Sequence, residues 1–312
     1  MQPVAKTLVL GQYRGHPLEV SYWDNEHQGP GPALLLIHGL FDHKGTWQGL
    51  WPHLQNRFRL VALDLVGFGH SSKPRLDDRP PSYPYSAAMH AEHLREFISR
   101  LGLRQVVLAG HSLGGGVALY LCCTWPELAG RLRGLVLIAP AAYPQPLPGY
   151  ARQLSDWRGA ILRWPLVPRL VLGTGLAAWA VRRTLRRVFH DPAKIPAGSL
   201  EAATGILRTP DVFCAYRYAV RNIVPPDHEA LVARFGKIGC PALVVWGRQD
   251  RIVPVEFAAR LAADIPTARL RIFEECGHAP HLEYPDLVAG LIAAWYPTDA
   301  PEEYTPCRTT PN

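Results

Sequence analysis

The stretch Val106–Gly116, which reads VVLAGHSLGGG, decides the fold. Its apolar run Val106–Ala109 stops at Gly110, and an alternately small and apolar segment begins after Gly114. This pattern predicts a buried strand, a tight turn and a helix. Ser112 stands at the tip of the turn, within the G-x-S-x-G pattern that is typical of a nucleophile elbow.

The glycines around Ser112 have a steric reason. A serine on so sharp a turn holds strained backbone angles, and side chains on its neighbours would collide with the strand and the helix. The turn also aims the first amides of the helix toward the group that the serine attacks. Because so short a pattern also arises by chance in glycine-rich chains, a catalytic Ser112 requires a histidine and a carboxylate elsewhere in the sequence.

Size and composition fit a globular protein. The chain has 312 residues, of which 48% are hydrophobic and 19% are charged, enough for a sizeable core and one or two domains. Residues 1–7 lack the pattern of a secretory signal, and no apolar run reaches the roughly 18 residues of a membrane span. The six cysteines show neither C-x-x-C spacing nor a paired framework, which favours small core residues in a reducing, cytoplasmic environment.

Continuous apolar runs predict strands that are buried on both faces. They lie at residues 33–37, 60–64, 106–109, 135–138, 242–246 and 270–273, with an alternating antiparallel strand at 18–23. Helices are predicted over 255–264 and between Ser86, as the cap, and Gly102, as the end. Strands that alternate with helices predict a doubly wound, mostly parallel sheet, whose functional groups gather at the carboxyl ends of the strands.

Two candidate partners of Ser112 follow predicted strands. Asp250 comes after strand 242–246, and His278 comes after strand 270–273. Serine, aspartate, histidine is one of the known chain orders of a serine triad. In that chemistry the histidine takes the serine proton, and the carboxylate holds the imidazole in the useful tautomer. The alternatives are that Asp250 only caps the following helix and that His278 is a surface loop residue.

Two further side chains compete with this assignment. His281 lies three positions after His278, but Gly277 gives His278 more room for a close approach. Asp64 also ends a predicted strand, although it precedes the serine. We expect Asp64 to hold the loop Gly67–Gly69, with substrate contact as the alternative.

Two backbone N–H groups are needed to stabilise an oxyanion. One is expected from Leu113, directly after the nucleophile, and the other from the loop after the first buried strand. Leu40 is the preferred donor on that loop, and Phe41 is the alternative. Of the histidines nearby, we expect His111 to pack beneath the elbow and His38 to brace its loop.

The middle of the chain has its own composition. Between Ala141 and Pro225 there are 12 Arg plus Lys and 4 Asp plus Glu, a charge of +8, so the net charge of +7 leaves −1 for the rest. Residues 143–224 also interrupt the alternation of strands and helices, which predicts a helical cap over the carboxyl edge of the sheet. The predicted core therefore comprises 1–142 and 225–296, and the Pro- and Thr-rich tail 297–312 is predicted to be disordered.

Five short stretches together resemble the α/β-hydrolase superfamily, in its branch with a serine nucleophile and a helical cap. They are His38–Leu40, Asp64–Ser71, Gly110–Gly115, Gly247–Asp250 and Gly277–Pro280, in the family's order. The resemblance implies the α/β-hydrolase fold, with Ser112, Asp250 and His278 as the catalytic residues. Esterases, lipases, carbon–carbon bond hydrolases and cofactor-free haloperoxidases share these motifs. Epoxide hydrolases and haloalkane dehalogenases are disfavoured, since they carry aspartate at the position of Ser112.

These observations predict a carboxylic ester hydrolase for hydrophobic, acyl or lipid-like substrates, which acts through an acyl-enzyme. The alternatives are hydrolysis of a carbon–carbon bond in a dienoic diketone, and a ligand receptor of the same fold with an unused triad. The sequence has no phosphate-binding G-x-x-x-x-G-K-[ST] loop and no clustered His or Cys ligands, so neither a cofactor nor a metal is expected. No nucleic-acid-binding motif accompanies the basic charge, so no nucleic-acid partner is expected.

The cap suggests one further contact. Leu166–Val181 is mostly apolar, and Arg182–Arg187 follows with four arginines. One hypothesis is a lid that rests peripherally on an anionic membrane surface. The alternative is a cap whose apolar face covers the active site and whose arginines are solvated. The sequence does not fix the oligomeric state.

Overall fold

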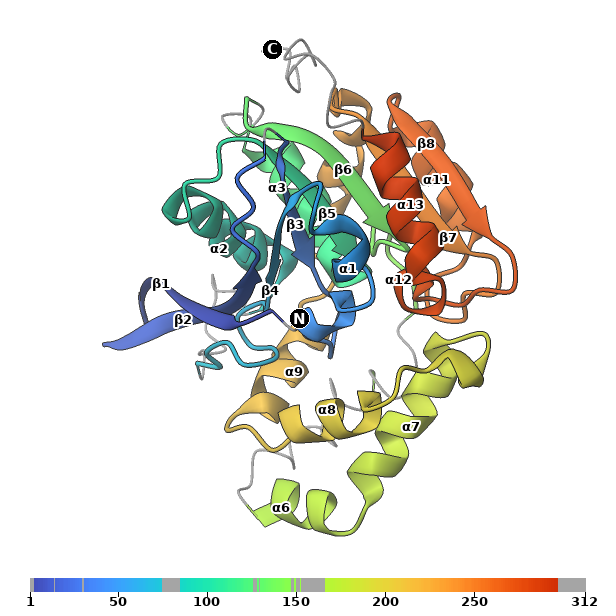
Figure 1. The fold of residues 1–312 in the computed structure, drawn as a ribbon. Coiled ribbons are helices and arrows are strands. Elements are labelled where there is room, and N and C mark those ends of the chain that lie inside the picture. The colour runs from blue at the N-terminus through green and yellow to red at the C-terminus, as the bar shows by residue number, and fades with distance from the viewer. Residues whose placement is uncertain are drawn as a thin grey trace.

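The computed structural model describes residues 3–296 except 14, 30, 75–84, 126, 127, 129, 147, 148, 150, 151 and 153–165. The predicted tail 297–312 and part of the predicted cap lie outside the described residues. A twisted sheet crosses the molecule with helices on both of its faces, and helices α6 to α9 lie together at one end (Figure 1).

The sheet has eight strands in the spatial order β1-β2-β4-β3-β5-β6-β7-β8. The pairs from β4 to β8 are parallel, whereas β2 pairs antiparallel with both β1 and β4. The strands are β1 (Ala5–Tyr13), β2 (His16–Asp24), β3 (Ala33–Ile37), β4 (Arg59–Leu63), β5 (Val106–His111), β6 (Leu132–Ile138), β7 (Ala242–Gly247) and β8 (Ala268–Phe273). The predicted doubly wound, mostly parallel sheet is confirmed, and β1 is an additional strand that the apolar pattern did not predict.

Helices cover both faces of this sheet. The α-helices are α1 (Trp51–Leu54), α2 (Ala87–Arg100), α3 (Leu113–Thr124), α6 (Leu166–Gly173), α7 (Leu176–Val188), α8 (Ser199–Ile206), α9 (Val212–Arg221), α10 (His228–Val232), α11 (Glu256–Asp264), α12 (Pro280–Glu283) and α13 (Pro285–Trp295). Short 3-10 turns are η1 (Lys44–Trp47), η3 (Pro192–Lys194) and η4 (Phe235–Lys237). As predicted, Ser86 caps α2, because its Oγ accepts a hydrogen bond from the N–H of Met89, and Gly102 follows the helix with a φ of +66°.

Alternate residues of the central strands enter two different hydrophobic clusters. Leu35 and Ile37 of β3 pack into the larger cluster, with α2, α3 and α11, whereas Leu34 and Leu36 pack into the cluster under α1 and α13. Both faces of β3 are therefore buried, which explains why its sequence is apolar without interruption. The two packed faces hold the carboxyl ends of the strands in fixed positions.

Helices α6, α7, α8 and α9 follow β6 and precede β7 in the chain, within the predicted cap range 143–224. The apolar stretch at 166–181 does not form one helix. It divides between α6 and α7 at Gly175, whose φ is +76°, a conformation that glycine adopts readily. The boundaries of the cap stay a prediction.

Candidate active site

Ser112 occupies a strained turn between β5 and α3. Its φ of +52° and ψ of −116° are rare for a residue with a side chain. The turn is fixed on both sides, because the Ser112 N–H donates to the Ile138 carbonyl at 2.9 Å and the Ser112 carbonyl accepts from the Ala141 N–H at 2.9 Å. The backbone of β6 and of the loop after it therefore holds the serine in place.

The neighbouring glycines are required by close backbone contacts. A Cβ on Gly110 would lie 2.4 Å from the carbonyl oxygen of Gly114, and a Cβ on Gly114 would lie 2.2 Å from the carbonyl oxygen of Ile37. Real Cβ atoms do not approach backbone so closely. The elbow thus packs directly against the end of β3, as the steric argument from the sequence expects.

Asp250 and His278 lie in contact at the ends of β7 and β8. The Nδ1–H of His278 donates to Oδ2 of Asp250 at 2.7 Å, and both side chains are buried. The other carboxylate oxygen, Oδ1, accepts from the N–H groups of Ile252 at 2.7 Å and Val253 at 2.9 Å. Asp250 therefore has two roles. One carboxylate oxygen fixes the turn at Ile252 and Val253, and the other pairs with His278. This bond places the proton on Nδ1 and leaves the lone pair on Nε2.

His111 joins the loop of His278 to the elbow of Ser112. The Nε2–H of His111 donates to the His278 carbonyl at 3.0 Å, and the two ring centroids are 4.8 Å apart. Burial, and then the neighbouring histidines, hold the pKa of His111 well below its usual value, so the ring is neutral. Because His111 directly precedes Ser112, this bond brings the histidine loop against the serine turn.

His281, the competing histidine, faces a different group. Its Nε2 is 2.9 Å from Oγ1 of Thr46, and its ring centroid is 4.7 Å from that of Trp47. The residue is fully buried, and burial lowers its pKa to about 3. The structure thus pairs Asp250 with His278, the histidine that the sequence favours.

The two predicted oxyanion donors lie on either side of Ser112 in the fold. Leu113 is the first residue of α3, so its N–H is one of the amides that have no acceptor within the helix. The loop after β3 passes close to the serine, since a Cβ on Gly39 would lie 3.3 Å from the Cβ of Ser112. Leu40 and Phe41 follow on this loop, and Phe41 has a strained φ of +63°. The choice between them stays a prediction.

Asp64 holds two loops beside the site. Its carboxylate is fully buried and accepts from the N–H of Lys44 at 2.6 Å, from Nζ of Lys44 at 2.7 Å and from the N–H of His70 at 2.8 Å. A Cβ on Gly69 would lie 2.2 Å from the carboxylate carbon. Burial alone would raise the pKa of Asp64, but interactions with His70 and the Lys44 ammonium outweigh it and lower the pKa below its usual value. The loop-holding role expected for Asp64 agrees with these contacts.

His38 links the same two loops. Its Nδ1–H donates to the Gly39 carbonyl at 2.8 Å, and its Nε2 accepts from the N–H of Leu65 at 3.0 Å. Burial lowers the pKa of His38, so the neutral ring that this pairing requires is favoured. His38 therefore braces the loop that carries Leu40, in line with the expectation from the sequence.

Glu283 is a positioning residue that the sequence reasoning missed. Its buried carboxylate accepts from the N–H groups of Gly277 at 2.6 Å, His190 at 3.1 Å and Asp191 at 3.3 Å. The N–H of His278 also donates to the Val188 carbonyl, at the end of α7, at 2.7 Å. The histidine loop is thus bonded directly to the segment after α7. The only signal in the sequence was the place of Glu283, five positions after His278.

Aromatic rings connect α9 to the loops that surround the serine. The ring centroid of Tyr216 lies 4.8 Å from that of Phe41 and 5.4 Å from that of Phe68. These contacts set α9 against the loops that follow β3 and β4. Among the residues that the structure describes, no group of three or more His, Cys, Asp or Glu side chains is placed to hold a metal ion.

The chain is similar to several known proteins. Residues 32–285 match the sequence profile described as the alpha/beta hydrolase fold. An uncharacterized protein of Mycobacterium tuberculosis is 32% identical, over 88% of this chain and 78% of its own length. A pimeloyl-[acyl-carrier protein] methyl ester esterase of Nitrosomonas europaea is 30% identical, over 84% of this chain and 94% of its own length.

A carbon–carbon bond hydrolase is similar to about the same degree. The 2-hydroxymuconate semialdehyde hydrolase of Pseudomonas putida is 29% identical, over 88% of this chain and 91% of its own length. Among solved structures, the 2-hydroxy-6-oxo-6-phenylhexa-2,4-dienoate hydrolase of Rhodococcus superposes with a TM-score of 0.73 at 24% identity. It covers 94% of this chain and 98% of its own chain, and at that identity the likeness concerns the fold alone.

Proposed function

We propose that this chain, which belongs to the alpha/beta hydrolase fold family, is a serine hydrolase that cleaves carboxylic esters of hydrophobic substrates. One observation carries the proposal: His278, which is bonded to Asp250, sits on a loop that His111 ties to the strained turn of Ser112. A strained serine, an oriented imidazole and a buried carboxylate are the three parts that acyl transfer needs.

The proposed mechanism assigns one task to each group. Nε2 of His278 accepts the proton of the Ser112 hydroxyl as the oxygen attacks the ester carbonyl. The Asp250 carboxylate stabilises the imidazolium that forms. The backbone N–H groups of Leu113 and Leu40 bind the oxyanion, and each such donor typically contributes about 2.7–4 kcal/mol to transition-state stabilisation. His278 then returns the proton to the leaving alkoxide, and water releases the acyl-enzyme by the same route.

Two observations favour a hydrophobic ester. The relative from Nitrosomonas europaea is a methyl ester esterase by name, and the match covers 94% of its length. The helical segment also offers apolar side chains near the site, since Tyr216 of α9 packs against Phe41 and Phe68. An apolar wall there would bury the acyl or alkyl part of a substrate.

The experiment compares the wild-type protein with Ser112→Ala and with Ser99→Ala, a control at an exposed serine of α2. Each is incubated with a fluorophosphonate probe and with a series of p-nitrophenyl esters of increasing chain length. We expect labelling and turnover in the wild type and in Ser99→Ala. In Ser112→Ala, labelling should vanish and kcat should fall about 10⁴-fold or more. Absence of labelling in the wild type would refute the proposal and would favour a ligand receptor.

A carbon–carbon bond hydrolase is the second candidate, and the relative from Pseudomonas putida favours it. The two functions share the serine, so labelling does not separate them. Turnover of a coloured dienoic diketone without turnover of any p-nitrophenyl ester would replace the ester proposal with this one.

A further inference from the structure

Helices α6 and α7 form a hairpin that carries exposed hydrophobic side chains. Leu170 is 66% exposed, Leu176 is 55% exposed and Trp179 is 59% exposed. Among the described residues, these are three of the eight large hydrophobic side chains that are exposed, and they lie within ten positions of the chain. A concentration of this kind marks an interaction surface more often than scattered exposure does.

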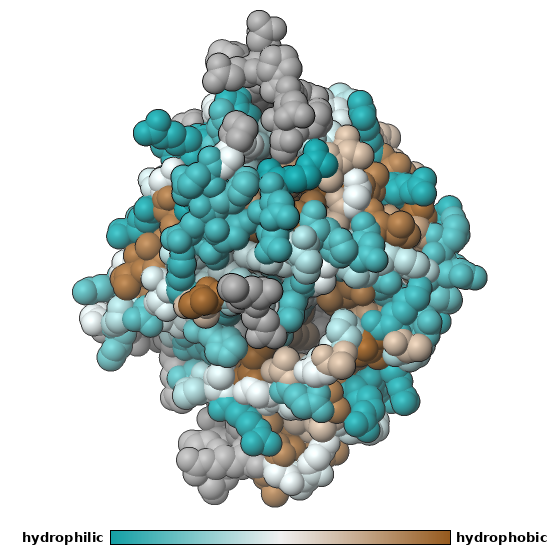
Figure 2. All heavy atoms as spheres, viewed as in Figure 1, coloured by the Kyte–Doolittle hydropathy of each residue, from teal (hydrophilic) through white to brown (hydrophobic). Residues whose placement is uncertain are grey.

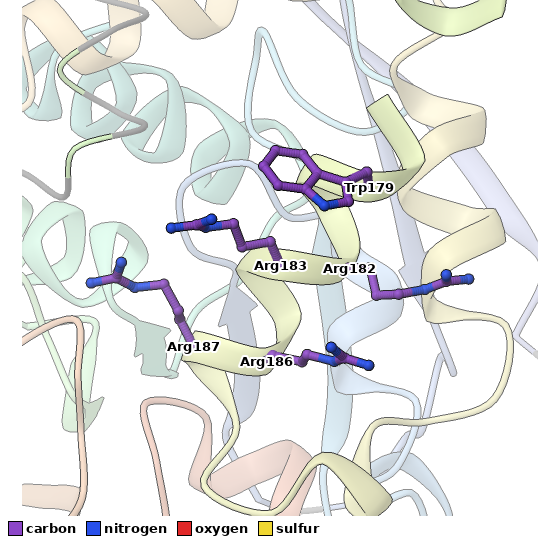
Figure 3. Close-up of a pocket in the computed structure, with 5 residues that line it drawn as sticks. All are labelled: Trp179, Arg182, Arg183, Arg186 and Arg187. Carbon is purple, nitrogen blue, oxygen red and sulfur yellow. The ribbon is translucent and has the colours of Figure 1, made fainter. Parts of the chain in front are cut away.

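The same hairpin is strongly basic. Arg182, Arg183, Arg186 and Arg187 are all exposed, and the sequence has no acidic residue from 166 to 190. Together with Trp179 the four arginines line a hollow of about 360 Å³ on α7 (Figure 3). Arg183 and Arg187 extend to one side of the helix and Arg182 and Arg186 to the other, and the guanidinium of Arg183 lies 5.5 Å from the Trp179 ring.

The apolar and basic side chains share one face of α7. Leu176, Trp179, Arg183 and Arg187 recur at spacings of three and four residues, so they follow each other along the outer face. The opposite face, which includes the buried Ala177, packs toward the neighbouring helices. Figure 2 shows hydrophobic and hydrophilic atoms side by side at the lower end of the molecule, where α6 to α8 lie. Among the residues that the structure describes, the outer face is therefore not used for packing.

We infer that this hairpin surface, defined by Leu170, Leu176, Trp179 and the four arginines of α7, docks on the surface of an anionic phospholipid bilayer. The leucine and tryptophan side chains enter the region between headgroups and acyl chains, where tryptophan is favoured. The arginines pair with lipid phosphates while their aliphatic stems lie along the apolar boundary. Each half of the surface thus meets the part of a bilayer that complements it.

The composition of the surface argues against other occupants. A nucleic acid would use the arginines but would leave the apolar side chains of the hairpin tip without partners. A protein partner would need acidic groups opposite the arginines and an apolar pocket opposite the tip, whereas every anionic bilayer presents both layers together. No helix in the described part of the chain combines the length and the apolar character that crossing a bilayer requires.

The position of the hairpin connects docking to the candidate active site. In Figure 1, α6 lies at the lower end of the molecule, and α7 runs upward from it toward the sheet. The end of α7 is bonded to the loop of His278 through the Val188 carbonyl. If the chain is the ester hydrolase proposed above, a docked hairpin holds its active site beside a reservoir of lipid esters. The docking itself does not depend on that activity.

The test measures co-sedimentation of the full chain with phosphatidylcholine vesicles that contain or lack phosphatidylglycerol. It needs no turnover, so its failure is distinct from failure of the proposed function. Three variants are compared with the wild type, each first shown to unfold at the same temperature. The basic variant changes Arg182, Arg183, Arg186 and Arg187 to Gln, and the apolar variant changes Leu176 and Trp179 to Ser. The charge control changes four exposed arginines elsewhere, Arg57, Arg104, Arg131 and Arg269, to Gln.

We expect the wild type to bind only the vesicles with phosphatidylglycerol, and to do so less at high ionic strength. The binding of the basic variant should be about 600-fold weaker, since each of the four basic residues near an anionic surface contributes about fivefold. The apolar variant should bind the anionic vesicles about tenfold more weakly, or weaker still. The charge control has the same net charge as the basic variant, and its binding to the anionic vesicles should weaken by less than about threefold.

Four results would overturn the inference. The first is that the wild type fails to bind anionic vesicles, and the second is that the charge control loses as much as the basic variant. The third is that the apolar variant binds as well as the wild type while transfer RNA displaces both, which would indicate a general polyanion site. The fourth is a self-association of the chain that the apolar variant abolishes, which would assign the surface to a second copy.

Discussion

Two helices that reach the candidate site, α3 and α7, differ almost completely in their burial. In α3, every residue from Leu113 to Cys122 is buried, whereas in α7 only Ala177 is buried. Yet each helix is fixed to the site at one end. Helix α3 begins directly after Ser112, and α7 ends at Val188, whose carbonyl accepts from the N–H of His278.

The difference in burial between α3 and α7 shows which residues are constrained by folding and which are not. The residues of α3 are apolar or small all round, because sheet and helices enclose the helix. The outer residues of α7 touch solvent, so packing within the chain does not select them. Their tryptophan, leucine and arginines are therefore not explained by packing among the described residues.

The largest expected effect is on the buried ion pair of the core. Lys44→Met leaves the Asp64 carboxylate buried without its cation, which should lower the free energy of unfolding by about 3–5 kcal/mol. Arg183→Met, on the exposed face of α7, should change it by about 0.5 kcal/mol or less. Urea unfolding measures the change in the free energy of unfolding for both variants. Similar small losses in the two variants would show that the ion pair of Lys44 and Asp64 does not stabilise the fold.

A smaller effect is expected from a single added methyl group. Gly114→Ala places a Cβ against the backbone at the end of β3 and should destabilise the protein by about 3 kcal/mol, with loss of the elbow geometry. Gly173→Ala, at the end of α6, meets nothing within 4 Å. It should be neutral or stabilising by about 1 kcal/mol or less. Thermal unfolding measures the stability of both variants. A Gly114→Ala variant as stable as the wild type would contradict a rigid elbow.

The third effect depends on pH and concerns the buried histidines of the core. Burial lowers the pKa of His90 to about 3, whereas in the unfolded chain the pKa of histidine is about 6.5. Above pH 6.5 the ring is neutral in both states, so its protonation does not affect the free energy of unfolding. As the pH falls from about 6.5 toward 3, the unfolded chain binds a proton that the folded chain excludes, and stability is lost.

His90→Leu tests this contribution through the change in stability between pH 7 and pH 5. The wild type should lose about 2 kcal/mol more than the variant over that interval, at about 1.4 kcal/mol per pH unit below the unfolded pKa. His16→Leu, an exposed control on β2, should follow the wild type. Urea unfolding at both pH values supplies the measurement, and equal losses in all three proteins would contradict a buried neutral His90.

Local pattern was sufficient for much of the fold. The predicted strand at 33–37 coincides with β3, and the cap at Ser86 and the end at Gly102 mark the limits of α2. Each of these signals lies within a few residues of the boundary that it sets. Strand β1 escaped prediction because only Leu10 is buried and the alternation of its side chains shifts where its pairing shifts, between Val9 and Gly11. A strand held mainly by its neighbour leaves little trace in its own sequence.

The candidate site was predicted from signals of the same kind. Motifs and chain order indicated Ser112, Asp250 and His278 as a triad, and their places after predicted strands indicated one edge of the sheet. Contacts that depend on side chains far apart in the chain were not predictable. The bond from His190 to Glu283 spans 93 positions and involves a backbone donor, which no residue pattern announces.

The attachment at residues 188–191 has a mechanical consequence. The Val188 carbonyl and the N–H groups of His190 and Asp191 bind the loop of His278 and the carboxylate of Glu283. A rotation of the helical segment about this attachment would move α6 through the largest arc and Val188 through the smallest. In such a rotation, the imidazole of His278 would therefore stay aligned.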